Sequence, residues 1–453
     1  MSVQTENSDP SIRLVGYFRE AESYLYGNSP ELINQHRKKA LQDFLIRGIP
    51  SRKNENYKYT NLQPSFLQDF NWLPHREITG YELPDLFKCH VPRLDVFQII
   101  LMNGWFHSTN GFLPEGVFAG SLERFAVENR KFFREYYTKI TDGYEDPLVS
   151  LNTAFARDGY VLYVPANVKI EKPVQVINLL KAQGDIFVTQ RNLVIVEPGA
   201  EVKLIICDHT LNLNQYLSNS ATEVFIGGNA SVEFLTLQNH HNQSVMVNSS
   251  GFHLERDSRL TTQTITLHGG LVRNNVEVIL DGTNSEANLY GVSFTDRKQH
   301  VDNFIRVLHE KPECRSNQLY RNVLDNESSG AFSGRIHVKR DAQKTNAYQK
   351  NNNLLLTDKA QMQTKPQLII EADDVKCSHG ATVGQIDEEA LFYLRARGIG
   401  ENQARLMLTN AFSYEVVRQI DDVTLRDQIS ELVGKRLTGE IGRCHESAYR
   451  ANC

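Results

Sequence analysis

The sequence predicts a mainly β fold, in which a parallel β-helix is flanked by helical regions at both ends of the chain. Two observations carry this prediction. From about residue 150, short β-rich runs recur between clusters of turn residues, and the clusters return about every 25 to 30 residues. Over the same stretch no helical pattern separates the runs, which disfavours an α/β sheet. A β-sandwich fits the strands almost as well, but it predicts closer turns, about 8 to 12 residues apart.

Residues 1–145 are predicted to form a helical and mixed region. Ser29 suits the N-cap of a helix, Pro30 suits its first turn, and Gly48 suits its end. Apolar residues between them fall near one helical face: Leu32, Ile33, Ala40, Leu41, Phe44 and Leu45. A polar, aromatic stretch follows at 51–62, and residues 70–145 show no dominant period.

Residues 146–385 are predicted to form the β-helix core. Strands of about four to seven residues are expected at 161–164, 174–180, 193–196, 202–207, 224–226, 232–237, 260–267 and 276–280. Turn clusters such as EPGAE, GGNAS and DGTNSE separate these strands. At this period the core is expected to have about nine or ten coils.

Residues 386–440 are predicted to be helical again. Asp387 can cap a short helix that stops at Gly398. A longer helix is expected from about Glu401 to Ile420, with one stripe made of Ala404, Met407, Leu408, Ala411, Phe412, Val416 and Ile420. A third helix carries Leu425, Ile429, Leu432 and Val433, and residues 441–453 form a polar tail that we expect to be mobile.

Composition limits the function classes. The chain has 453 residues, of which 40% are apolar and 23% charged, values typical of a globular protein. Its formal net charge of −5 gives no general basic surface for nucleic acid. We expect no membrane span and no secretory signal, and therefore a cytoplasmic location. The six cysteines are too scattered for a disulfide framework: Cys89, Cys207, Cys314, Cys377, Cys444 and Cys453.

Motifs of self-sufficient enzymes are missing from the sequence. It has no phosphate-binding G-x-x-x-x-G-K-[ST] loop, so we expect no nucleotide on this chain. The glycines near residue 400 lack the third member of a dinucleotide fingerprint, and neither H-E-x-x-H nor G-x-S-x-G occurs. The sequence therefore predicts a protein that is not an enzyme.

One pair of residues has the composition of a metal site. Cys377 and His379 are separated by one residue, so on a strand they point to the same face with Cα atoms about 7 Å apart. A thiolate and an imidazole there could meet at one soft metal, but a closed tetrahedral site needs four ligands. The remaining ligands must come from elsewhere in the fold or from another chain. By spacing alone, a structural role fits the pair better, and Lys376 is interpreted as a solvated surface residue.

Other candidates are assigned structural interpretations. Glu371, Asp373 and Asp374 fit a solvated acidic turn better than a set of oxygen ligands for iron. His209, His240 and His241 are expected as polar residues on strand faces. The tail residues Cys444, His445 and Cys453 could bind metal loosely, but a disordered tail without such a role fits them better.

The region from Gly334 to Gly400 closely resembles the SufB/SufD family, the scaffold proteins of the SUF iron–sulfur cluster assembly machinery. The runs that carry the resemblance are DAQKTNAYQ, NNNLLL, TKPQL, DVKCSHGATVG and LFYLRARGI. The form KCSHGATVG resembles the SufD branch rather than the SufB branch. ENYKYTNL at 55–62 is similar to the SufD motif E-x-W-K-Y-T, with Tyr57 in the place of the tryptophan.

The resemblance implies a right-handed parallel β-helix and a set of partners. It implies that the chain pairs with SufB through the 334–385 end of the β-helix, and that helices within 386–440 dock the SufC ATPase, which hydrolyses the ATP. It also implies that His379, with Cys377 as a neighbouring ligand, contributes to iron entry and to a transient iron–sulfur cluster at the SufB interface. Histidine can replace thiolate in some clusters. A reduced flavin within the complex is compatible with the same resemblance.

Two alternatives stay open. The first is a SufB-like scaffold that receives sulfur itself and acts as a homodimer. The second is a β-helix carbohydrate-active enzyme, which would need clustered acidic or basic residues along one groove. The sequence shows no repeated set of that kind.

Overall fold

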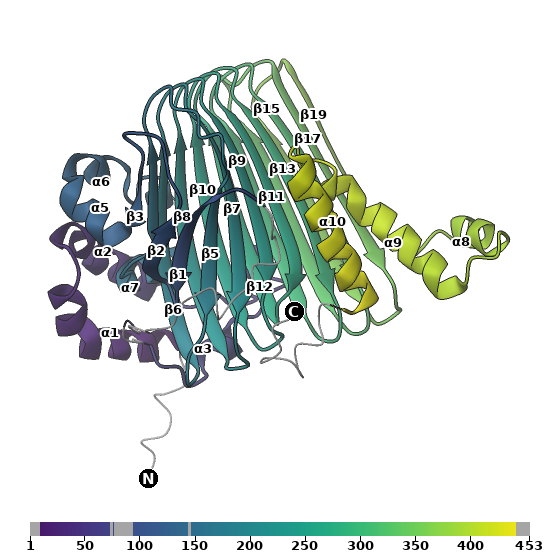
Figure 1. Cartoon of the computed structure of the whole chain (residues 1–453), viewed down its shortest axis with the longest axis horizontal. Coiled ribbons are helices and arrows are strands. Elements are labelled where there is room, and N and C mark those ends of the chain that lie inside the picture. Colours follow the sequence, from purple (N-terminus) through teal and green to yellow (C-terminus); the bar gives the residue numbers. More distant parts are fainter. Residues whose placement is uncertain (1–9, 73–75, 77–93, 144–145, 441–453) are drawn as a thin grey trace, which may run out of the picture.

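Two long sheets of mostly parallel strands form the body of the molecule (Figure 1). The computed structural model describes residues 10–72, 76, 94–143 and 146–440. The β19 sheet contains β2 (Trp105–Asn110), β1 (Phe97–Met102), β5 (Val174–Leu180), β7 (Glu201–Thr210), β9 (Ser231–Asn239), β11 (Arg259–His268), β13 (Glu286–Thr295), β15 (Arg315–Leu324), β17 (Thr345–Leu355) and β19 (Val375–Gly384). The β18 sheet contains β3 (Phe118–Ser121), β4 (Tyr160–Val164), β6 (Ile186–Val196), β8 (Tyr216–Ile226), β10 (Val245–Leu254), β12 (Leu271–Leu280), β14 (His300–His309), β16 (Ser329–Val338) and β18 (Gln361–Ile370).

The chain alternates between the two sheets, which makes a parallel β-helix and confirms the predicted fold class. Neighbouring parallel strands of one sheet are offset by 26 residues at Val245 and Leu271 (271 − 245) and by 32 at Ser329 and Gln361 (361 − 329). The pairs β4–β5 through β18–β19 give eight turns, fewer than the nine or ten expected. Most strands are also longer than expected, at nine to eleven residues from β6 onward.

One corner of most turns contains a residue with left-handed backbone. Positive φ recurs at Asn229 (59°), Asp257 (58°) and Asn284 (60°), inside the predicted turn clusters. Asn and Asp tolerate this conformation better than other residues with a side chain, because their short polar groups can bond locally. The clusters therefore mark true corners.

The interior of the β-helix is apolar along one half of each strand and polar along the other. Side chains such as Val202, Leu204 and Ile206 meet in one continuous cluster between the sheets. In the other half, buried amides bond from turn to turn, as Asn322 Nδ2 does to Asn353 Oδ1 at 2.7 Å. These polar residues explain why the strands extend beyond the apolar runs seen in the sequence.

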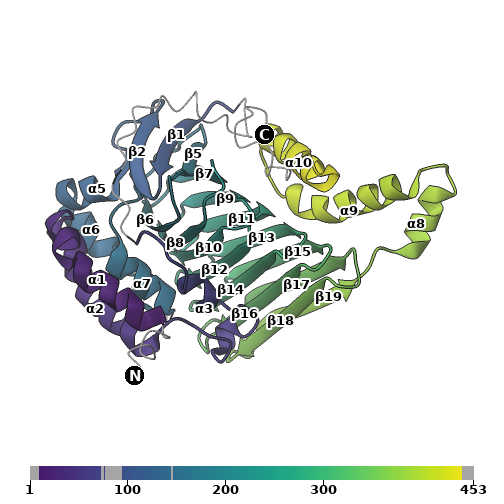
Figure 2. The ribbon, with the colours of Figure 1, turned by 90° about the horizontal axis from the view of Figure 1, so that it is seen from below.

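The N-terminal helices cover the outer face of the β18 sheet (Figure 2). They are α1 (Pro10–Gly27), α2 (Glu31–Arg47), η1 (Glu55–Tyr57), α3 (Gln63–Phe66), α5 (Leu122–Glu128), α6 (Arg130–Tyr136), η2 (Thr141–Gly143) and α7 (Pro147–Phe155). The predicted helix is confirmed as α2 with Gly48 at its end, but the expected N-cap Ser29 is wrong. Pro30 occupies that position, and Ser29 Oγ accepts a hydrogen bond from Arg37 Nη2 at 2.9 Å. Leu45 is exposed rather than on the buried face.

The three predicted C-terminal helices are present as α8 (Glu388–Arg395), α9 (Glu401–Val417) and α10 (Val423–Thr438). Asp387 caps α8 as predicted, with its side chain accepting from two backbone N–H groups. α9 ends three residues earlier than expected, and Met407 and Ala411 of the predicted stripe are exposed. The helix packs near Leu354 of β17 through Ala404 and on the β19 sheet through Val416. α10 packs on that sheet through the four predicted residues, Leu425, Ile429, Leu432 and Val433. None of the helices described is both long and apolar enough to span a bilayer.

Candidate functional site

The last turn of the β-helix has two edges to which no described strand is paired. β19 bonds only to β17, and β18 bonds only to β16 (Figure 2). Most side chains of both strands are exposed or half-buried, in contrast to the buried strands behind them. Unpaired strand edges present rows of N–H and C=O groups that can pair with a further strand.

Cys377 and His379 both lie on β19, as the sequence predicted. Their register partners on β17 are Ala347 and Gln349, which are buried and face the interior. Cys377 packs against an apolar cluster that contains Ile336, Val338 and Ala347, so it faces the interior too. His379 follows two positions later, on the same side of the strand, and it is exposed. Cys377 and His379 therefore lie on the interior side of β19, at the open end of the β-helix.

The thiol of Cys377 is not activated by its surroundings. Burial raises its pKa above the ordinary value, and a hydrogen bond with the backbone of Ala347 only partly opposes this effect. Lys376 is exposed, as the sequence indicated, and burial rather than its charge sets the direction of the pKa shift. Cys377 must lose a proton to bind a metal, so its binding is expected to favour high pH.

The site is incomplete on this chain. Within residues 10–72, 76, 94–143 and 146–440, no group of three His, Cys, Asp or Glu residues is placed to hold a metal ion. Cys377 and His379 are two candidate ligands, one soft and one borderline, at the open end. A tetrahedral site would require the others from a partner or from the cargo itself.

Two buried glutamines lie behind His379 and were missed by the sequence analysis. Gln318 on β15 pairs in register with Gln349 on β17, which pairs with His379 on β19. Gln349 Nε2 donates to Gln318 Oε1 at 2.7 Å. The signal that could have found them is the turn period, because each precedes the next residue of this column by about 30 positions.

The acidic candidates form an exposed turn, in line with the expectation. Glu371, Asp373 and Asp374 connect β18 to β19, and all three are exposed. Glu371 accepts a hydrogen bond from His337 Nε2 at 2.7 Å, which lowers the pKa of the carboxyl group.

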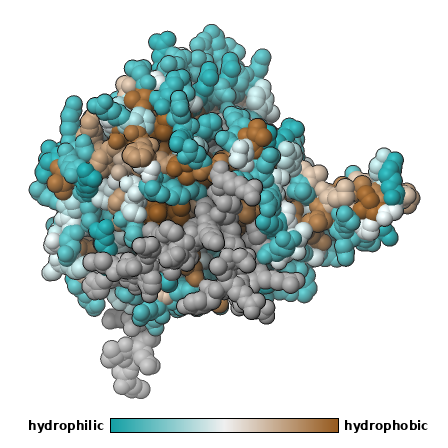
Figure 3. Space-filling view, in the orientation of Figure 1, coloured by the Kyte–Doolittle hydropathy of each residue, from teal (hydrophilic) through white to brown (hydrophobic). Residues whose placement is uncertain are grey.

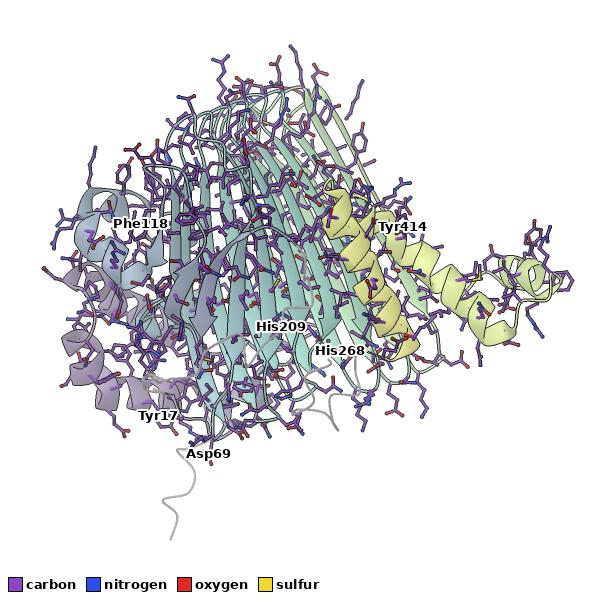
Figure 4. The ribbon with its side chains drawn as sticks, viewed as in Figure 1. Tyr17, Asp69, Phe118, His209, His268 and Tyr414 are labelled. Atoms are coloured by element: carbon purple, nitrogen blue, oxygen red, sulfur yellow. The ribbon has the colours of Figure 1, made fainter. Side chains whose placement is uncertain are left out.

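The histidines near the middle of the chain agree only in part with the expectation of strand-face residues. His209 lies on β7 as expected, but His240 and His241 lie in the turn after β9, and all three are buried. Figure 4 shows His209 and His268 in the lower half of the β19 sheet, on β7 and β11, with β9 between these strands. Burial lowers the pKa of His240 to about 3, so its imidazole is neutral at pH 7. The tail residues Cys444, His445 and Cys453 lie outside the described residues.

None of three hollows on the described surface borders Cys377 or His379. One lies between β7, β9 and the α9–α10 turn, one lies beside α2 and η2, and one opens near Phe112 and Lys169. The hollow near Phe112 lies at the first turns of the β-helix, and β19 is at the opposite end of the sheet.

A second exposed surface lies at the free end of the C-terminal helices. α8 projects away from the β-helix (Figures 1 and 2). Two of its aromatic residues are exposed, Phe392 at 73% and Tyr393 at 55%. Figure 3 shows apolar side chains along this projection. Large exposed aromatic residues on a projecting element are typical of a protein-binding surface.

Comparisons with known proteins agree with this arrangement. Residues 178–412 match the family model described as the SufBD core domain of the SUF system for FeS cluster assembly, and residues 9–176 match the model of the SufBD N-terminal region. An iron–sulfur cluster assembly SufBD family protein of Synechocystis is 28% identical over 86% of this chain and 87% of its own length. The iron–sulfur cluster assembly protein SufD of Escherichia coli is 28% identical over 88% of this chain and 92% of its own. SufD of Bacillus subtilis is 27% identical over 71% of this chain and 74% of its own length.

Proposed function

Because the chain belongs to the SufBD family of iron–sulfur cluster assembly proteins, we propose that it is the SufD-type scaffold subunit of a complex with SufB and the SufC ATPase. The observation that carries the proposal is the open last turn, where two candidate ligands face an interior that a second β-helix could close. Two of the similar proteins are named SufD, which favours SufD over SufB. A cytoplasmic location belongs to the same proposal.

In this proposal SufB binds the free edges of β18 and β19. Extension of both sheets by strands of a partner would satisfy the edge N–H and C=O groups and bury the exposed side chains of the last turn. It would also bring the partner's ligands to the end of the β-helix. Cluster formation would then depend on assembly, because the described residues of this chain hold no full ligand set and the partner would supply the rest.

His379 and Cys377 would act on iron and sulfide as the substrates of assembly. The imidazole of His379 offers a lone pair without losing a proton when it is neutral, so it is suited to first contact with iron. Cys377 lies deeper and holds its proton more tightly, so it is suited to a later step, after a metal lowers its pKa. We propose no catalytic turnover on this chain.

The second contact, with SufC, is proposed for α8 and the exposed part of α9. α10 is buried against the β19 sheet, so most of its apolar face is already used. Phe392 is exposed and free to enter a partner's pocket, and Tyr393 beside it is exposed with the Arg397 guanidinium on its ring. ATP-driven movement of SufC would then be transmitted through α9 to the last turns, since Arg321 on β15 pairs with Glu415 on α9. Unchanged cluster yield with an ATPase-dead SufC would contradict this step.

The test is anaerobic co-expression with SufB and SufC, followed by visible absorption and iron content of the purified complex. Three variants are compared with the parent: His379→Ala, Cys377→Ala and the matched control Ser378→Ala, an exposed residue between them. We expect all three complexes to assemble, and His379→Ala to lose its chromophore. If His379→Ala and Cys377→Ala load iron and sulfide like the control, the pair is structural and the proposed ligand role fails.

The alternative is a SufB-like homodimer, which the same family membership allows. It predicts that the chain alone forms a stable dimer and acquires a cluster without a separate SufB. Size-exclusion chromatography with light scattering, with and without SufB, separates the two proposals.

A further inference from the structure

A column of three polar residues crosses the last three turns at one register. Gln318, Gln349 and His379 occupy matching positions on β15, β17 and β19, which are adjacent in the β19 sheet (Figure 2). Matching residues of neighbouring strands lie about 4.8 Å apart, so each member can reach the next. Gln349 therefore has Gln318 on one side and His379 on the other.

The orientation of the Gln349 amide is fixed from behind. Gln349 is 3% exposed, and its Nε2 donates to Gln318 Oε1 at 2.7 Å. Its amide extends toward Gly334 on β16, where an added Cβ would collide with it. Nε2 and Oε1 lie on opposite sides of the planar amide, so with Nε2 directed at Gln318 on β15 the oxygen is directed away from β15, and β19 is the neighbour of β17 on that other side.

This oxygen is an acceptor with no protein partner. Gln349 Oε1 is buried without a hydrogen bond in the described structure. A buried carbonyl oxygen without a donor is unfavourable and rare in folded proteins. The one residue that the register places next to it on the open side is His379, whose neutral ring carries a single N–H.

We propose that Gln349 is a positioning residue for His379. When the exposed His379 side chain turns toward the interior, its ring N–H donates to Gln349 Oε1, which fixes one tautomer and leaves the other ring nitrogen free to bind iron or the nascent cluster. Metal-binding histidines generally hold their second nitrogen in this way, and loss of the outer partner typically weakens metal binding about 10- to 100-fold. The inference rests on the proposed role of His379 for its function, but not for the hydrogen bond.

The test reads the tautomer directly, without metal or partners. The full-length chain is labelled with ¹⁵N-histidine, and ring ¹H–¹⁵N correlations are recorded at pH 8, where an ordinary imidazole is neutral. The signals of His379 are those missing from His379→Ala. We expect one tautomer in the parent, a mixture of both in Gln349→Leu, and one tautomer in Gln349→Glu, which keeps an acceptor oxygen.

The matched control is Asn303→Leu, which removes a buried interior amide on β14. It should leave the His379 signals unchanged. The proposal is overturned if the parent already shows both tautomers, if Gln349→Leu leaves the ring signals as they are, or if Asn303→Leu changes them equally. Should Gln349→Leu not fold, Gln349→Met keeps the side-chain length and carries the same test.

A second readout separates this inference from the proposed function. In the complex with SufB and SufC, Gln349→Leu should lower iron affinity about 10-fold or more. If His379→Ala leaves cluster content unchanged while the tautomer depends on Gln349, the hydrogen bond stands and the proposed function fails. If His379→Ala loses the cluster but the His379 tautomer is the same in the parent and in Gln349→Leu, the proposed function stands and this inference fails.

Discussion

The guanidinium of Arg273 lies over the ring of Tyr57, 4.4 Å from the ring centroid, and joins the N-terminal segment to the β18 sheet. Tyr57 Oη also donates to Asp146 Oδ2 at 2.6 Å. Arg273 pairs with Asp302, which accepts a hydrogen bond from Thr60 of the same segment. The stretch that resembles a family motif is thus a clamp that fixes residues 55–60 to the β-helix.

We expect Tyr57→Phe to lower the free energy of unfolding by about 1–3 kcal/mol. The substitution keeps the ring under Arg273 but removes a donor to Asp146, whose carboxyl group is buried and already has a pKa raised by desolvation. Urea denaturation followed by circular dichroism measures the change. Tyr59→Phe, in the same segment but half-buried, is the control and should be near neutral. Equal effects of both substitutions would contradict the clamp.

The pair formed by Arg191 and Glu223 is fully buried, with nitrogen and oxygen 2.7 Å apart. Glu223 also accepts hydrogen bonds from the backbone N–H groups of Thr138, Ile140 and Thr141. Removing one charge leaves the other buried without compensation, so Glu223→Gln should cost about 3–5 kcal/mol in unfolding free energy.

The matched control for this pair is Glu233→Gln, which breaks the half-exposed pair with Lys203. A pair in contact with water contributes little, so the change should stay below about 1 kcal/mol. Both free energies come from urea titration of the full chain. A loss at Glu223 as small as that at Glu233 would show that water reaches the buried pair.

Glu123 predicts a pH dependence of stability. Burial, and after it the charge of the neighbouring Asp158, raise its pKa to about 7. The folded state therefore binds a proton more tightly than the unfolded state, and stability falls as pH rises from about 4.5 toward 7. Above pH 7 the carboxylate of Glu123 is charged in the folded state as well, and its whole destabilising effect on folding is present.

Glu123→Gln should remove this dependence. We expect the variant to be more stable than the parent at pH 8 and to lose this advantage at pH 4.5, as measured by urea midpoints. The difference between parent and variant isolates Glu123 from buried histidines such as His240 and His309, whose lowered pKa values act in the opposite direction. A constant difference across this pH range would contradict the prediction.

The sequence predicted the fold because eight of the strands from β4 to β12 carry an apolar run and turn clusters separate them. It underestimated strand length because residues such as Arg273, Asn274 and Asn275 are polar yet buried in β12. Their burial depends on partners one turn away, as Asn274 Nδ2 bonds to Asn303 Oδ1 at 3.0 Å. A short stretch of sequence that contains such a residue is predicted as a loop, because its hydrogen-bond partner lies about 30 positions away and outside that stretch.

The candidate site was predicted only in part for the same reason. The spacing of Cys377 and His379 placed both on one side of a strand, which follows from the period of two. Which side faced the interior, and that Gln349 stood behind His379, depended on the register between β17 and β19. Register is set by the whole stack of turns, so no local pattern reveals it.

The last prediction concerns the exposed end of the C-terminal helices. Phe392 and Tyr393 lie on α8, which has a single residue buried, Leu391. Their replacement by serine removes little buried area, so the unfolding free energy should change by less than about 0.5 kcal/mol. If the aromatic rings fill pockets of SufC, each loss should cost about 2 kcal/mol of binding, roughly 30-fold in Kd.

Leu432→Ala on α10 is the control with the opposite expectation, a loss of stability without a loss of SufC binding. Leu432 is buried in the cluster between α10 and the β19 sheet, so the substitution should cost about 2–5 kcal/mol in stability. We expect it to keep SufC affinity at temperatures where the chain stays folded, as measured by calorimetry with purified SufC. If Phe392→Ser binds SufC like the parent while Leu432→Ala loses binding in a folded chain, the docking surface lies on α10 and not on α8. That outcome would place the ATPase against the sheet rather than at the projecting end.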